Sequence, residues 1–168
     1  MSWITSAEGT AGATPLEQVL GQCPELLTRY RAFYKAIWEE GLVSRRVLEL
    51  CRLRIAAIHG CDQEWSVRDA CVELNDAELQ ALETGDRSAF GVEEQAALIL
   101  AEQIPYQHHQ VTDQQTTEAG HQLSTPGAVA LLTALAFFDV TCRLKLTLDV
   151  AALPAQLAEP PLNRGALA

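Results

Sequence analysis

The most constraining feature of the sequence is a segment, Arg45 to His59, that has helical spacing and is apolar on most sides. Its apolar residues are Val47, Leu48, Leu50, Cys51, Leu53, Ile55, Ala56, Ala57 and Ile58. A helix that is apolar on most sides is stable only when other parts of the chain cover it. Ser44 is a good N-cap before this segment, and Gly60 is a helix stop after it. We therefore expect a buried central helix and a fold that is built around it.

The rest of the chain also predicts helices rather than strands. Apolar residues recur at i, i+3 and i+4 spacings, and strand-like alternation never lasts for more than a few residues. Only Gly60 separates residues 45–59 from residues 61–74, so these two helices are predicted to pack as an antiparallel hairpin. Pro105 is expected to halt another helix. We expect an all-α fold with helices over residues 15–22, 25–40, 45–59, 61–74, 75–85, 92–103 and 125–150, and one that begins at Thr112.

The 168 residues are enough for one domain with a sizeable core. We expect a flexible tail over residues 1–13, a single helical domain over residues 14–155 and an irregular tail over residues 156–168. The net charge of −10 makes nucleic acids and anionic membranes unfavourable partners. The longest apolar run, residues 128–138, is too short to span a bilayer, and the first residues lack a signal-peptide pattern. Together with an odd, widely spaced set of five cysteines, this favours a soluble cytoplasmic protein.

Three residues that could take part in a chemical reaction follow the central segment. Cys61, Glu64 and Arg68 recur at i, i+3 and i+7, so a helix over residues 61–74 would carry them on one face. Glu49 lies in a segment too apolar to leave it fully solvated, and the predicted hairpin would bring it to the same face. Glu64 and Arg68 also have the spacing of a helical ion pair. The predicted site therefore consists of Glu49, Cys61, Glu64 and Arg68.

This stretch resembles the signature of alkylhydroperoxidase D, a member of the carboxymuconolactone decarboxylase superfamily. The signature is a glutamate, eleven residues, a cysteine, two residues, a second cysteine, three residues and a histidine. Glu49 and Cys61 match its first two positions, whereas Glu64 and Arg68 stand where the second cysteine and the histidine would be. The flanking sequences RLRIAAIHGC and RDACVELNDAELQALETGD are also similar to the family. The resemblance covers residues 24–155.

The resemblance implies an alkylhydroperoxidase D-like helical bundle that assembles as a trimer or hexamer and reduces hydroperoxides. Cys61 would be the nucleophile and Glu49 the base, while Glu64 and Arg68 would shape the pocket. Some decarboxylase-type members have Glu-Trp-x-x-His where this chain has Glu64-Trp65-x-x-Arg68. That similarity implies acid/base chemistry on a small carboxylate as a second possible activity.

The changed motif leaves Cys61 without a resolving cysteine on the next helical turn. A resolving thiol must then come from elsewhere, and Cys51 and Cys71 are candidates if the fold brings them near, because a disulfide needs Cα atoms within about 7 Å. With neither of them near, oxidation is expected to stop at a sulfenic acid or at a mixed disulfide with an external thiol.

Other interpretations stay open on the sequence alone. In one of them Cys61 is an inert buried cysteine, and Glu49 is merely paired with Arg45 or Arg52 at helical spacing. In a second, the protein is an acid/base enzyme in which Arg68 binds a small carboxylated substrate. In a third, it is an oligomeric family member without catalysis. No metal or cofactor is predicted, because the chain lacks Cys-x-x-Cys, His-x-x-x-His, a phosphate loop and a dinucleotide fingerprint.

Two further expectations concern single elements. His59, next to Gly60, is interpreted as a helix C-terminal histidine rather than as a catalyst. The long helix over residues 125–150 has more apolar surface than one small domain needs, so we expect part of it to face another subunit.

Overall fold

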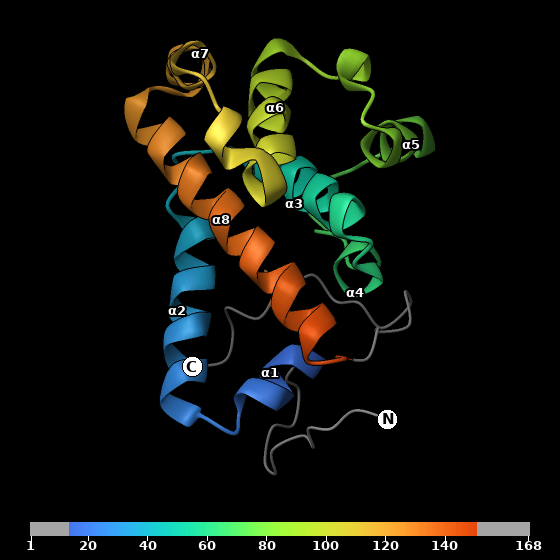
Figure 1. The fold of residues 1–168 in the computed structure, drawn as a ribbon, viewed down its shortest axis with the longest axis vertical. Helices are drawn as coiled ribbons and strands as arrows, with labels where there is room; N and C mark the ends of the chain where they lie inside the picture. Colours follow the sequence, from blue (N-terminus) through green and yellow to red (C-terminus); the bar gives the residue numbers. More distant parts are fainter. Residues whose placement is uncertain (1–13, 151–168) are drawn as a thin grey trace.

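The computed structural model describes residues 14–150, and Figure 1 shows these as a bundle of helices. No residue from 14 to 150 lies in a β-strand, so the expected all-α fold is confirmed. The tails expected over residues 1–13 and 156–168 lie outside the described residues, as do residues 151–155 of the expected domain. The α-helices of the described part are α1 (Pro15–Leu20), α2 (Pro24–Glu39), α3 (Arg45–His59), α4 (Asp62–Trp65), α5 (Asp76–Thr84), α6 (Val92–Gln107), α7 (Asp113–Leu123) and α8 (Thr125–Thr147).

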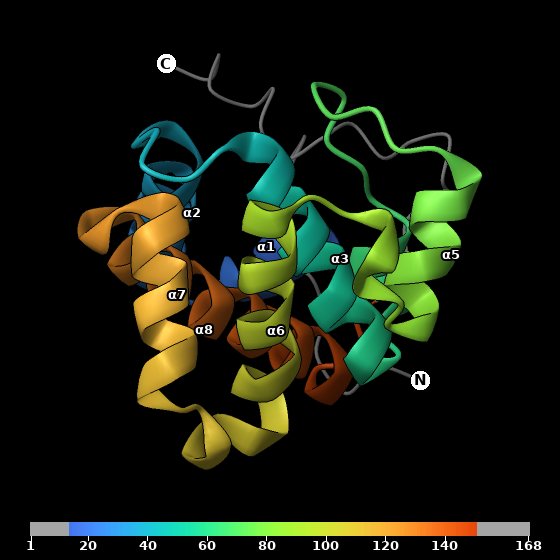
Figure 2. The same cartoon turned by 90° about the horizontal axis from the view of Figure 1, so that it is seen from above.

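Helix α3 is the central helix of the bundle, as its apolar sequence predicts. It packs against α6 and α8 and also contacts α4 and α5. Figures 1 and 2 show α5 on one side of α3, and α2 and α7 on the opposite side of the bundle. Leu50, Leu53 and Ile55 are completely buried. The expected burial of residues 45–59 is therefore confirmed, because nine of the fifteen residues are buried and the other six are only partly exposed.

The helix boundaries follow from local capping. The Ser44 hydroxyl accepts a hydrogen bond from the Val47 N–H at 3.2 Å and begins α3. Gly60 ends α3 in the left-handed conformation (φ 60°), which a residue with a side chain adopts only with strain. Reciprocal capping boxes begin α1, α5 and α7 as expected, with the pairs Thr14 and Glu17, Asn75 and Glu78, and Thr112 and Gln115.

The predicted helix over residues 61–74 is wrong, and the antiparallel hairpin with it. Helix α4 contains only Asp62–Trp65, and residues 66–75 form turns and loop. The cause is the buried Arg52 side chain, which donates hydrogen bonds to the carbonyls of Glu64 at 2.8 Å and Val67 at 2.6 Å. The Asp69 N–H likewise donates to the Glu49 carboxylate at 3.0 Å. Backbone groups that a continuing helix would use are thus bonded to the side chains of α3 instead.

Pro105 does not halt its helix as expected. Helix α6 continues to Gln107, with Pro105 buried in its last turn. The helix continues although proline lacks the N–H that would bond the carbonyl four residues earlier. The carbonyl of Pro105 accepts a hydrogen bond from Arg143 of α8 at 2.6 Å, which fixes this end of α6 against α8.

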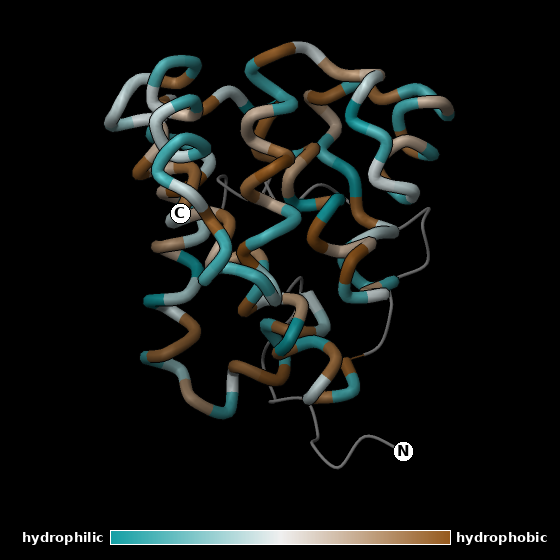
Figure 3. Tube along the Cα trace, turned by 45° about the horizontal axis from the view of Figure 1, so that its top comes forward, coloured by the Kyte–Doolittle hydropathy of each residue, from teal (hydrophilic) through white to brown (hydrophobic). Residues whose placement is uncertain are grey.

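Helix α8 is long and apolar enough, by length and composition, to cross a membrane, yet 44% of its most apolar stretch is buried against the rest of the bundle. It packs on α3, α6 and α7. Its charged residues Asp139, Arg143 and Lys145 are all paired with other helices or with each other. Figure 3 shows apolar and polar positions alternating along the helices, as expected when one face of each lies in a core. Contacts of this kind are typical of a core helix.

Candidate functional site

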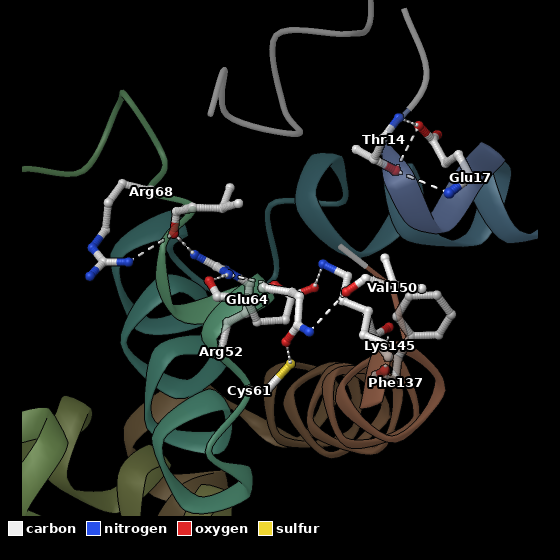
Figure 4. Close-up of polar contacts among 12 residues, drawn as sticks. Thr14, Glu17, Arg52, Cys61, Glu64, Arg68, Phe137, Lys145 and Val150 are labelled. Carbon is white, nitrogen blue, oxygen red and sulfur yellow. Dashed lines mark hydrogen bonds and ion pairs between the residues drawn. The ribbon is translucent and has the colours of Figure 1, made fainter. Parts of the chain in front are cut away.

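A buried ion-pair network lies between α3, α4 and α8, and Arg52 is its centre (Figure 4). Arg52 is only 2% exposed and uses all five of its N–H donors. It forms a bidentate pair with Glu49, with both bonds at 2.8 Å, and bonds the Glu64 carboxylate at 2.6 Å. The other two donors go to the backbone carbonyls of Glu64 and Val67. A guanidinium is stable in a protein core only when its N–H donors are all hydrogen-bonded, as they are here.

Glu64 joins this network to α8. One carboxylate oxygen accepts from Arg52, and the other accepts from the ammonium of Lys145 at 2.5 Å. Burial raises the pKa of Glu64, but the charges and hydrogen bonds of Lys145 and Arg52 outweigh burial, so the pKa lies below its ordinary value. Glu64 is therefore a carboxylate at neutral pH. Two carboxylates and two cations make the network electrically balanced.

Glu49 is paired with Arg52, which was one of the two partners expected from its spacing. Its first oxygen accepts from Arg52 and from the Asp69 N–H, and its second accepts from Arg52. Both oxygens are engaged, and the residue is 1% exposed. A role as a general base would require these hydrogen bonds to break. Asp69 itself is buried 3.6 Å from Arg45.

Arg68 does not share a face with Cys61, because α4 ends at Trp65. The Arg68 guanidinium lies over the Trp65 ring at 4.9 Å and donates to the carbonyl of Val67 at 3.1 Å. The expected ion pair with Glu64 is not formed. Figure 4 shows Arg68 on the far side of Arg52 from Cys61. The structure thus brings Glu49, Cys61 and Glu64 together but separates Arg68 from them.

The pKa of the Cys61 thiol is affected by a second thiol, Cys142, which the sequence spacing did not indicate. Cys61 precedes α4 and Cys142 lies on α8; both are buried, and each thiol shifts the pKa of the other. The interaction with Cys142 lowers the pKa of Cys61 below its ordinary value; burial opposes this, while the Glu64 N–H and the Lys145 charge assist it. The same interaction and burial raise the pKa of Cys142. Cys61 is therefore the thiol that ionises first, and Cys142 keeps its proton.

Neither of the two cysteines expected as partners is in this position. Cys51 is buried in α3, where desolvation and the charge of Glu94 raise its pKa. Cys71 is exposed in the loop after α4. A signal for the missed partner is nevertheless visible in the sequence. Cys142 and Lys145 are spaced i, i+3 in an apolar helix, so they share one face of α8.

Two tyrosines of α2 cover the site from a fourth helix. The Tyr30 hydroxyl is hydrogen-bonded to Thr141 of α8, the residue before Cys142. Burial raises the pKa of both Tyr30 and Tyr34, and the negative charge of Glu64 raises them further. Both phenols are therefore neutral at physiological pH. The thiol pair lies in a region with ordered charges and neutral phenols rather than in a purely apolar core.

The side chain of Gln63 connects this site to the end of α8. Its amide oxygen accepts from the Cys61 thiol at 3.5 Å, and its amide nitrogen donates to the carbonyl of Val150 at 2.9 Å. Cys61 is fully covered with Gln63 in this position.

Within residues 14–150, no group of three histidine, cysteine, aspartate or glutamate side chains is arranged to hold a metal ion. No family model, curated protein or solved structure matches the chain when it is compared with known proteins. The function therefore has to be inferred from the geometry of the site.

Proposed function

We propose that this protein is a thiol-dependent oxidoreductase that reduces a hydroperoxide, with Cys61 as the nucleophile and Cys142 as the resolving thiol. The observation that carries the proposal is that these two buried thiols are electrostatically coupled beside the Glu64 and Lys145 ion pair. The family resemblance of residues 24–155 leads to the same chemistry by a separate route. Cys142 takes the part that the second cysteine of the motif has in the resembled family.

The reaction that fits this pair has two steps. The Cys61 thiolate attacks one oxygen of the peroxide, so that an S–O bond forms, the O–O bond breaks and the other oxygen leaves as an alcohol after taking up a proton. The Cys142 thiol then attacks the sulfenic sulfur, forming an S–S bond and releasing water. An external dithiol returns two electrons by thiol–disulfide exchange and restores both thiols.

Cys142, the Glu64 N–H and the Lys145 charge favour this order of events, because they lower the pKa of Cys61 against the opposing effects of burial and the Glu64 charge. A thiolate is the reactive form, and Cys61 forms it more readily because of the Cys142 hydrogen bond and the Lys145 charge. Cys142 keeps its proton until it is needed to release water. Gln63 bonds both the Cys61 thiol and the Val150 carbonyl, so a peroxide that binds at the Cys61 sulfur replaces the first of these contacts.

The site gives less support to an acid/base enzyme. Glu49 and Glu64 are both held by cations, and the pKa of Glu64 is lowered, which makes it a weak proton acceptor. Arg68 lies over the Trp65 ring and donates to the Val67 carbonyl, so its guanidinium is engaged away from Cys61. A non-catalytic oligomeric protein is the remaining alternative, and it requires no reactive thiol.

The test is one equivalent of peroxide followed by peptide mass spectrometry without reduction. We expect a disulfide between Cys61 and Cys142, no peroxide turnover in Cys61→Ser, and an oxidised Cys61 without a disulfide in Cys142→Ser. Cys51→Ser is the matched control, because it removes another buried thiol outside the site, and it should behave like the parent protein. Unchanged peroxide consumption in Cys61→Ser would refute the proposal.

A further inference from the structure

A second polar cluster lies where the ends of α3 and α6 meet the middle of α8. His59, the last residue of α3, bonds Asp139 of α8 through Nε2 at 2.7 Å. The other ring nitrogen, Nδ1, bonds the hydroxyl of Tyr106 of α6 at 2.9 Å. The three side chains form a continuous Asp–His–Tyr chain, and the proposed thiol chemistry uses none of them.

The partners of His59 determine which atoms donate and which accept in this series of hydrogen bonds. A carboxylate can only accept, so the Nε2 atom of His59 carries a hydrogen that it donates to Asp139. In the neutral imidazole, Nδ1 is then an acceptor and receives the phenolic hydrogen of Tyr106. A hydroxyl that donates to a histidine, which in turn donates to a carboxylate, is the arrangement that activates a nucleophile.

Asp139 is held in place by Arg143, one turn later on α8. The Arg143 Nε lies 3.0 Å from each oxygen of Asp139, and its Nη2 donates to the carbonyl of Pro105 at 2.6 Å. The guanidinium also lies over the Tyr106 ring, 5.2 Å from its centroid. Within residues 14–150, Nη1 of Arg143 makes no hydrogen bond, which leaves one free cationic donor on the guanidinium that lies over the Tyr106 ring.

The exposure of the three side chains differs in the way that a catalytic site requires. The side chains of His59 and Asp139 are 3% and 15% exposed, so water competes little for their hydrogen bond. Tyr106 is 57% exposed. A surface hydroxyl is thus connected to a buried base. A connection that only stabilised the fold would not need the exposed phenol.

We propose that Tyr106, His59 and Asp139 form a second catalytic site, which cleaves small acyl esters through an O-acyl-tyrosine. Tyr106 attacks the ester carbonyl carbon while its proton moves to Nδ1 of His59. The bond to the alkoxy oxygen then breaks, and the alcohol leaves with that proton. Water attacks the acyl-tyrosine with His59 again as the base, which releases the carboxylic acid and restores Tyr106.

The free Nη1 of Arg143 defines the substrate class. A carbonyl oxygen becomes negatively charged as the nucleophile adds, and a fixed cationic donor beside it stabilises that charge. Asp139 does not touch the substrate and is a positioning residue, which sets the tautomer of His59. The site is independent of Cys61 and Cys142, because no step passes through a thiol.

The experiment uses the full chain with p-nitrophenyl acetate and locates the acetyl group by peptide mass spectrometry during the first turnover. We expect Tyr106 to be acetylated faster than the other tyrosines, and the site's release of p-nitrophenol to be lost in Tyr106→Phe. His59→Gln should slow the acetylation of Tyr106 roughly 100-fold, as expected for loss of a general base. Asp139→Asn should lower kcat and leave KM unchanged.

His121→Gln is the matched control, because it removes an exposed imidazole of α7 that belongs to neither site. It should leave acetylation of Tyr106 unchanged, as should Cys61→Ser, which separates this proposal from the thiol chemistry. Tyr106→Phe removes only a hydroxyl from an exposed side chain, so its folding is not at risk. Equal p-nitrophenol release by Tyr106→Phe and the parent protein would overturn the proposal, as would acetylation spread evenly over the surface.

Discussion

Replacing Arg52 by methionine should destabilise this protein more than any other single change of a charged residue in the network. Methionine has a similar length and fits an apolar site, so the substitution leaves little empty volume. It removes the five hydrogen bonds of the guanidinium to Glu49, Glu64 and Val67. Glu49 would then be a buried carboxylate without a counter-charge.

The magnitude follows from the burial of the network. Removing one partner of a buried ion pair costs about 3–5 kcal/mol, because the remaining charge stays desolvated. Arg52 neutralises Glu49 alone and shares Glu64 with Lys145, so we expect the loss at the upper end, about 4–5 kcal/mol. That is a large part of the roughly 5–15 kcal/mol that stabilises a typical domain.

The assay is urea unfolding at neutral pH, followed by far-ultraviolet circular dichroism. Arg31→Met is the matched control: Arg31 also pairs with a glutamate, Glu17, at 2.7 Å, but its side chain is 48% exposed. An exposed pair contributes only about 0–1 kcal/mol. If Arg52→Met lost no more free energy of unfolding than Arg31→Met, the network would not have the role that its burial implies.

A second substitution separates the charge effect from lost packing. Glu49→Gln should destabilise the parent protein, because it breaks the bidentate pair with Arg52. In the Arg52→Met background the same change removes the uncompensated charge and should restore part of the lost stability. Strictly additive free energies of unfolding in this double-mutant cycle would contradict the argument, because residues in direct contact are expected to be coupled.

Two further predictions concern the site, and a third concerns the exposed surface of α8. The pKa of Glu64 is lowered from its ordinary 4.5. The ionised Glu64 therefore contributes its full stabilisation above pH 4.5, and this stabilisation is lost as the pH falls through the lower, folded-state pKa. Urea titrations below pH 4.5 should show a shallower loss of stability in Glu64→Gln than in the parent protein. Cys142→Ala should raise the pKa of Cys61, so alkylation of Cys61 by iodoacetamide should move to higher pH, whereas Cys51→Ala should leave its pH profile unchanged. The exposed apolar side chains Val129, Val140 and Leu146 of α8 should face another copy of the chain, and sedimentation showing a stable monomer at micromolar concentration would rule this out.

Local patterns predicted most of the helices. Capping boxes and stop residues depend on atoms only three or four positions apart, so Thr14, Ser44 and Asn75 begin helices in the structure as they do in the sequence pattern. The burial of residues 45–59 was equally predictable, because a helix that is apolar on most sides is stable only when other parts of the chain cover it. The same reasoning failed over residues 61–74. There the helical spacing was present, but side chains of another helix took up the backbone groups.

The residues of the candidate site were likewise only partly predictable from the sequence. Sequence spacing selected Glu49, Cys61 and Glu64, which the structure brings together, and Arg68, which it does not. Arg52 was considered only as a partner of Glu49, although it proved to organise the whole network. Cys142 and Lys145 were missed because they are distant in the chain and reach the site only through the packing of α8 against α4.

By itself, the sequence determined that this chain is all-helical and that one helix lies at its centre, because helix formation and its termination are set by neighbouring residues. Only the tertiary structure decided which thiol faces Cys61 and which cations hold Glu64. It also decided that His59 connects Asp139 with Tyr106. These contacts join residues far apart in the chain, and their partners are selected by the desolvation of buried charges, which depends on how the helices pack and not on local spacing.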